Sequence, residues 1–184
     1  SMFFAASGLT SLDLTPLNTS NVTNMGDVFS NCINLTNLDL SSFKTNKVTD
    51  MSGLFYHCPS LTSLKVLTLN TNNVINMKQM FYGCKKLTEL DLSSFDTSNV
   101  TNMRDMFWNC SGIVSLNLSS INTEKVTDMG YMFERCYGLT NISLGDKFSF
   151  ADYYYLPSGT WYASDGTAYT SDGTIAMEQL KLLL

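Results

Sequence analysis

Hydrophobic residues recur along most of this chain at a constant spacing of 26 residues. No insertion or deletion shifts that spacing between the first cysteine and the last. A fixed period of this length is the signature of a repeat architecture, in which each unit stacks on its neighbours. The clearest columns are Cys32, Cys58, Cys84, Cys110 and Cys136; Phe29, Phe55, Phe81, Phe107 and Phe133; and Met25, Met51, Met77, Met103 and Met129.

Each unit changes its hydrophobic period partway along. In the fourth unit, Leu90 and Leu92 are spaced as on one face of a short β-strand, and Val100 follows a polar, turn-prone stretch. An Asn or Asp then precedes the first methionine of every unit, as an N-cap residue would. The spacing i, i+3, i+4 and i+7, which defines one face of two helical turns, is filled by Met103, Met106, Phe107 and Cys110.

One such unit cannot bury its apolar face alone, but stacked units form a continuous core. We therefore expect an α/β solenoid of the leucine-rich-repeat class, with a parallel β-sheet on one face and short helices or helical turns on the other. Residues 1–8 are a partial N-terminal repeat, and residues 9–144 hold five full units with the first strand of a sixth. Residues 145–184 lose the period, and their aromatic residues and Asp-Gly turn signals predict a C-terminal β-hairpin-like cap. A small ligand-binding module is the alternative for this segment.

The five cysteines admit two interpretations. An odd number of cysteines in a surface protein is compatible with disulfides and one thiol left over. Every cysteine occupies the same inward position, however, and Ala6 stands at that position in the partial unit. We therefore favour free thiols that are buried and pack as small apolar groups.

The outward positions of the predicted strands form a polar, mildly acidic face. Lys65 follows Asp39 and precedes Asp91 in one column, so it can offset the repulsion between stacked carboxylates. Exposed pairs of this kind contribute only ~0–1 kcal/mol. The face is either an ordinary solvated surface or a shallow groove for a basic peptide or loop. Its candidate binding residues are Asp13, Asp39, Lys65, Glu89 and Asp91.

A second candidate surface follows the phenylalanine column. The next residue along the chain turns away from the core, and three units place an aromatic ring there, namely Tyr56, Tyr82 and Trp108. Such rings are favoured in interfaces and can stack on sugars. They can equally shield the edge of the units by packing against one another, and the sequence leaves both possibilities open. Trp161 and Tyr162 in the closing segment are further binding candidates.

The motif that runs from Leu87 to Cys110 is specific: Leu-Thr-x-Leu-Asp-Leu-Ser-Ser-Phe-x-Thr-x-x-Val-Thr-x-Met-x-x-Met-Phe-x-x-Cys. It resembles the BspA-type leucine-rich-repeat surface proteins of bacteria, over residues 1 to about 150 and weakly at residues 156–162. The resemblance implies a secreted or surface-anchored protein that takes part in adhesion to host or extracellular-matrix proteins, or in contact between microbes. The third unit departs from the motif at residues 65–69. The family offers no binding residues to carry over.

Composition excludes several classes of function. The net charge of −5, without a basic stripe, argues against nucleic-acid binding. No stretch approaches the roughly 20 apolar residues that span a bilayer, so we expect no membrane insertion, and the first residues show no signal-peptide pattern. The cysteines lack metal-ligand spacing, His57 is the only histidine, and no Gly-rich phosphate loop occurs.

These observations lead to one main hypothesis and two alternatives. We expect a non-catalytic, adhesin-like module at the cell surface or outside the cell that binds a protein partner and needs no cofactor or metal. The first alternative is a glycan- or cell-wall-binding module. The second is a structural spacer of a larger surface protein.

Overall fold

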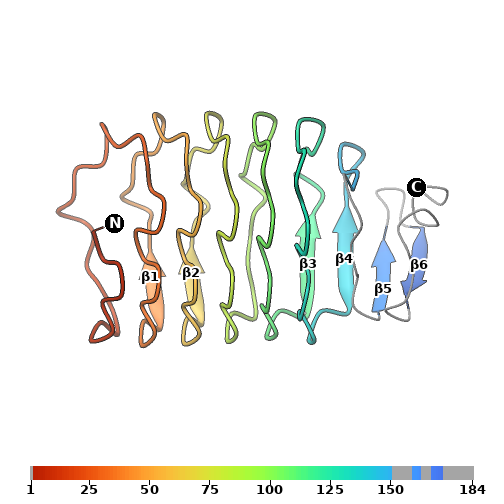
Figure 1. The fold of residues 1–184 in the computed structure, drawn as a ribbon, viewed down its shortest axis with the longest axis horizontal. Helices are drawn as coiled ribbons and strands as arrows, with labels where there is room; N and C mark the ends of the chain where they lie inside the picture. Colours follow the sequence, from red (N-terminus) through yellow and green to blue (C-terminus); the bar gives the residue numbers. More distant parts are fainter. Residues whose placement is uncertain (1, 151–158, 163–166, 172–184) are drawn as a thin grey trace.

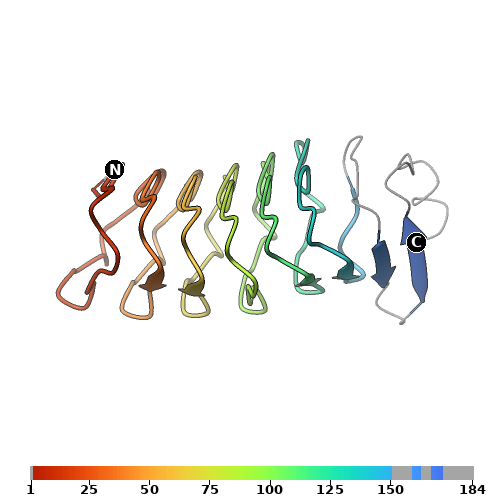
Figure 2. The same cartoon turned by 90° about the horizontal axis from the view of Figure 1, so that it is seen from below.

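The computed structural model describes residues 2–150, 159–162 and 167–171. Each 26-residue unit forms one coil of the chain, and successive coils lie side by side along a single long axis (Figure 1). In a view from below, the strands of successive coils lie along the same side of this stack (Figure 2). The strands are β1 (Asn37–Asp39), β2 (Ser63–Lys65), β3 (Ser115–Leu118), β4 (Asn141–Leu144), β5 (Gly159–Tyr162) and β6 (Ala168–Ser171).

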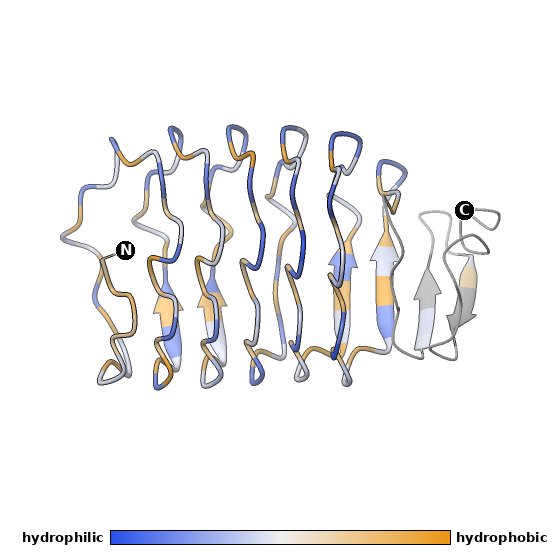
Figure 3. Cartoon of the chain, in the orientation of Figure 1, coloured by the Kyte–Doolittle hydropathy of each residue, from blue (hydrophilic) through white to orange (hydrophobic). Residues whose placement is uncertain are grey.

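The strands pair with the register that the repeat predicts. β1 pairs in parallel with β2, and β3 pairs in parallel with β4, so that Leu38 lies beside Leu64 and Leu116 beside Ile142. Along β3 and β4, exposed or half-buried residues alternate with buried ones. Hydrophilic and hydrophobic residues alternate in the same way along these strands (Figure 3). β5 continues this sheet in parallel beside β4, and β6 pairs with β5 in the antiparallel direction. The expected C-terminal antiparallel pair is therefore present, while its Asp-Gly turn at residues 165–166 lies outside the described residues.

A second ladder of parallel contacts joins the coils on another side. It consists of isolated bridges between the Asn or Asp residues that precede the first methionine of each unit. We call this side the bridge face. Its members are Asn24, Asp50, Asn76, Asn102 and Asp128.

The prediction of short helices is wrong. The described residues contain no helix, and residues 104–109, which follow Met103, form a series of turns instead. From Met106 to Cys110, every second N–H group donates to a carbonyl three residues earlier, as Met106 does to Met103 at 3.2 Å. The intervening N–H groups donate to the next coil, as Phe107 does to Met132 at 3.0 Å. An α-helix that began at Met103 would use the N–H groups of Phe107 and Asn109 within its own coil, so those groups could not join the coils.

Backbone conformation explains why a helix cannot propagate here. Two positions of the unit lie in the left-handed region, and in the fourth unit they are Asp105 and Asn109, each with φ of 56°. Left-handed residues interrupt a right-handed helix, and Asn and Asp tolerate that region better than most residues. Asn102, the expected N-cap, does accept a hydrogen bond from the N–H of the second residue after it, Arg104, at 2.9 Å, but this bond closes an Asx turn and no helix follows.

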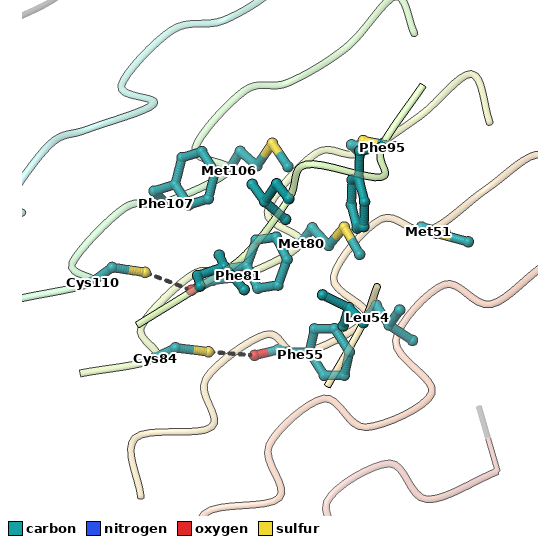
Figure 4. Close-up of a cluster of buried hydrophobic side chains, with 14 of the residues drawn as sticks. Met51, Leu54, Phe55, Met80, Phe81, Cys84, Phe95, Met106, Phe107 and Cys110 are labelled. Atoms are coloured by element: carbon teal, nitrogen blue, oxygen red, sulfur yellow. Dashed lines mark hydrogen bonds between the residues drawn. The ribbon is translucent and has the colours of Figure 1, made fainter. Parts of the chain in front are cut away.

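The inward positions are nevertheless those that the hydrophobic pattern predicts. Phe55, Phe81 and Phe107 are buried and form a column of stacked rings, with centroids 5.6 Å apart at each step (Figure 4). The same spacing therefore buries the same residues in a series of turns as it would in a helix. The core depends on the period and does not require helical structure.

A buried polar column completes the core, and the sequence interpretation missed it. One threonine per unit is buried at the same position. The hydroxyl of Thr97 donates to the carbonyl of Asn122 and accepts from the N–H of the same residue, both at 2.8 Å. Each hydroxyl thus ties its coil to the next one. The column comprises Thr19, Thr45, Thr71, Thr97 and Thr123.

Candidate functional site

The sheet is interrupted at the fourth unit. Residues 88–91 occupy the position of a strand but belong to none, and their backbone makes no hydrogen bond to either neighbouring coil in the part of the chain that the structure describes. In the second and third units the matching N–H groups do bond to the preceding coil, as Thr36 does to Thr10 and Thr62 does to Thr36. The interruption separates the β1–β2 pair from the sheet formed by β3 to β6.

A hollow of about 730 Å³ lies on the sheet face at this interruption. Its two sides come from residues 88–93 of the fourth unit and residues 114–120 of the fifth. Its lining is rich in hydroxyl, amide and carboxylate groups, and it includes no basic residue. We call it the sheet-face hollow. The charged residues that line it are Glu89 and Asp91.

Asp91 gives the hollow a fixed negative charge. Its carboxylate accepts a hydrogen bond from the backbone N–H of Ser93 at 2.9 Å. That bond, together with one to the Ser93 side chain, lowers the pKa of Asp91 below its ordinary value. The group is therefore ionised at neutral pH and attracts cationic side chains.

The other three predicted residues of the sheet face lie away from this hollow. Asp13 caps a turn in the first unit by accepting from Thr15. Asp39 pairs with Lys65 at 2.9 Å, but both side chains are at least half exposed, so the ion pair contributes little stability. Hydrogen bonding to Ser41, and then to Lys65, holds the pKa of Asp39 well below its usual range.

The predicted aromatic stripe forms one continuous stack. The ring centroids of Tyr56 and Tyr82 are 4.6 Å apart, and those of Tyr82 and Trp108 are 4.3 Å apart. The guanidinium of Arg135 lies 4.8 Å from the centre of the Trp108 ring. Both faces of Tyr82 and of Trp108 are thus covered by neighbouring groups. This geometry favours mutual packing over sugar binding, because stacking on a sugar requires an open ring face.

Two further candidates cannot be placed in the same way. The backbones of Trp161 and Tyr162 belong to β5. Their side chains lie outside the described part of the structure, so their role in binding stays a prediction.

All five cysteines are free and buried. Each thiol donates to a carbonyl in the preceding coil; for example, the Sγ of Cys84 lies 3.3 Å from the carbonyl oxygen of Phe55 (Figure 4). Burial raises the pKa of Cys58 and of Cys136 to about 12. The thiolate needed for nucleophilic chemistry is therefore disfavoured. These residues pack, as the sequence favoured, and disulfides do not link them.

The described residues show neither a metal site nor a membrane-spanning helix. These residues contain no group of three or more His, Cys, Asp or Glu side chains that could hold a metal ion. They also contain no helix with the length and apolarity needed to cross a membrane.

Comparisons with known proteins place the chain in a family without assigning an activity. No curated protein matches the sequence significantly. A leucine-rich repeat protein of Bacteroides ovatus, known from a crystal structure, is similar at 18% identity with a TM-score of 0.27. The alignment covers 68% of this chain and 48% of that protein, so the chain spans about half of that protein's length. The family described as "Mycoplasma protein of unknown function, DUF285" matches residues 1–67 and 36–148, and the chain belongs to this family.

Proposed function

We propose that this chain is a non-catalytic module that binds a protein partner, with the sheet-face hollow as its binding site. The interruption of the sheet is the observation that carries this proposal. It leaves the backbone polar groups of residues 88–91 without partners in the neighbouring coils, at the border of a hollow that contains the carboxylates of Glu89 and Asp91. An extended basic segment of a partner can supply both hydrogen bonds and positive charge to these groups.

The proposed biological setting follows from the repeat motif. Its resemblance to BspA-type surface proteins supports an adhesin-like role at the cell surface or outside the cell. The partner would then be a host or extracellular-matrix protein, or a protein on another microbe. The repeated thiols give no support to a catalytic role, because they are buried and burial raises their pKa values.

A conservative pair of substitutions tests the proposal by removing the negative charge of the hollow without changing its shape. The double variant Glu89→Gln/Asp91→Asn keeps an oxygen that can accept the hydrogen bond from Ser93. The matched control is Asp13→Asn/Asp39→Asn, which makes the same change in charge on the same face but outside the hollow. The measurement is the affinity for a Lys-rich synthetic peptide and for a panel of extracellular-matrix proteins.

We expect the hollow variant to bind at least about tenfold more weakly, which corresponds to about 1.4 kcal/mol, and the control to bind as the unaltered chain does. Equal losses in both variants would mean that net charge, and not the hollow, attracts the partner. Unchanged binding by the hollow variant, or no binding by the unaltered chain, would also contradict the proposal. Unfolding curves that coincide for all three proteins establish that the fold is intact.

A further inference from the structure

A second groove, of about 720 Å³, runs along the bridge face, and none of the sequence predictions concerned it. It crosses successive coils from the first full unit to the fifth. Two parallel columns line it, with their members two positions apart in each unit. One column is Thr23, Thr49, Ile75 and Thr101, and the other includes Lys47, Asn73, Asn99 and Lys125.

The threonine column offers methyl groups and an apolar side chain. The backbone N–H of Ile75 donates to Thr49, and that of Thr101 donates to Ile75, both at 2.8 Å. The hydroxyls of Thr49 and Thr101 donate to carbonyls of the preceding coil as well, each at 3.3 Å. Ile75 is 49% exposed in the middle of the column. The column is therefore a strip that presents methyl groups and the Ile75 side chain, and the backbone N–H groups of Thr49, Ile75 and Thr101 are already used between coils.

The second column offers amides and positive charge. Lys47 donates to the amide oxygen of Asn21 at 2.8 Å, and Lys125 donates to that of Asn99 at 2.7 Å. Each ammonium keeps further N–H donors for a ligand, since a lysine has three. The two lysines are three coil steps apart, or about 14 Å at the usual spacing of parallel strands. No carboxylate lines the groove.

We propose that this groove binds a linear acidic polysaccharide that lies along the stacking axis. The apolar faces of its sugar rings would rest on the strip around Ile75, and its carboxylate or sulfate groups would bind Lys47 and Lys125. The chain is acidic as a whole, and Asp50 and Asp128 belong to the bridge face, but the only charged side chains that line the groove are those of Lys47 and Lys125. More distant charges are largely screened at physiological salt.

The chemistry of the groove distinguishes this ligand from an extended acidic peptide. A peptide that adds to a sheet gains its affinity mainly from main-chain hydrogen bonds. From Thr49 to Thr101 the backbone N–H groups of the threonine column are already bonded between coils, so they have no such bonds to offer. A polysaccharide needs only side-chain amides, cations and apolar surface. This site is independent of the sheet-face hollow, which carries the opposite charge.

The test measures binding of heparin fragments, with neutral dextran and polyglutamate as comparison probes. The first variant is Lys47→Glu/Lys125→Glu, and Lys85→Glu/Lys86→Glu is the control with the same change in net charge outside the groove. A third variant, Ile75→Asn, alters the apolar strip without changing the charge.

We expect the unaltered chain and the control to bind heparin equally, and Lys47→Glu/Lys125→Glu to bind at least about tenfold more weakly. Ile75→Asn should bind more weakly too, although its charge is unchanged.

Several results would overturn the inference. Equal losses in the groove variant and its control would mean that binding follows net charge alone. Equal binding of dextran would remove the requirement for acidic groups, and equal binding of polyglutamate with the same response to the variants would indicate an acidic polypeptide. Unchanged heparin binding by Ile75→Asn, or no binding by the unaltered chain, would also contradict it.

Discussion

Replacing Phe81 with Ala is expected to lower the free energy of unfolding by about 3–5 kcal/mol. The ring is fully buried and stacks between Phe55 and Phe107, with centroids 5.6 Å apart on each side. Its removal leaves a cavity in the middle of the column. Because backbone hydrogen bonds hold the flanking coils at their spacing, they cannot close that cavity easily. Unfolding in urea, followed by circular dichroism, measures the loss.

A second substitution at the same site serves as the control. Phe81→Leu retains a large apolar side chain, so it should destabilise the protein clearly less than Phe81→Ala does. A loss below about 1 kcal/mol for Phe81→Ala would mean that the phenylalanine column is not a packed core.

Thr97→Val is expected to cost about 2–3 kcal/mol, although it preserves the shape of the side chain. The hydroxyl both donates to and accepts from the backbone of Asn122, at 2.8 Å in each direction. A methyl group in its place leaves the N–H and the carbonyl of Asn122 without their partner. Thr97 is only 1% exposed, so water has little access to replace the lost bonds. The same urea experiment measures this change.

Thr127→Val is the matched control. The hydroxyl of Thr127 also donates to a carbonyl, that of Thr101 at 3.2 Å, but the residue is exposed. Water can therefore satisfy that carbonyl, and we expect a change within about 0.5 kcal/mol. Similar losses at Thr97 and Thr127 would show that burial of the threonine column does not determine its contribution to stability.

The inward columns could be predicted from the sequence, but the element that carries them could not. The spacing i, i+3, i+4, i+7 buries Met103, Met106, Phe107 and Cys110 in a helix and equally in a series of turns. Hydropathy reports which side chains are buried and not where the backbone N–H groups bond. One signal was present: Gly53 and Gly83 stand in the two left-handed columns, where the fourth unit has Asp105 and Asn109.

The candidate surfaces could be predicted only in part, because the sequence does not show which backbone groups bond between coils. The period places Tyr56, Tyr82 and Trp108 in one column, and the structure stacks them as neighbours. The interruption at residues 88–91 was not predictable, because the fourth unit shows the repeat motif best and its pattern says nothing about bonding between coils. The bridge-face groove was missed because threonine, asparagine and lysine also occur at ordinary solvated positions.

The most direct test concerns the backbone partner of Phe107. Nuclear magnetic resonance detects a scalar coupling across a hydrogen bond, between the donor nitrogen and the carbonyl carbon of the acceptor. Stacked coils predict a coupling from the amide of Phe107 to Met132, whose carbonyl oxygen lies 3.0 Å from that nitrogen. A coupling to Met103 instead, the acceptor that an α-helix would use, would contradict the stacked-coil structure and the surfaces inferred from it.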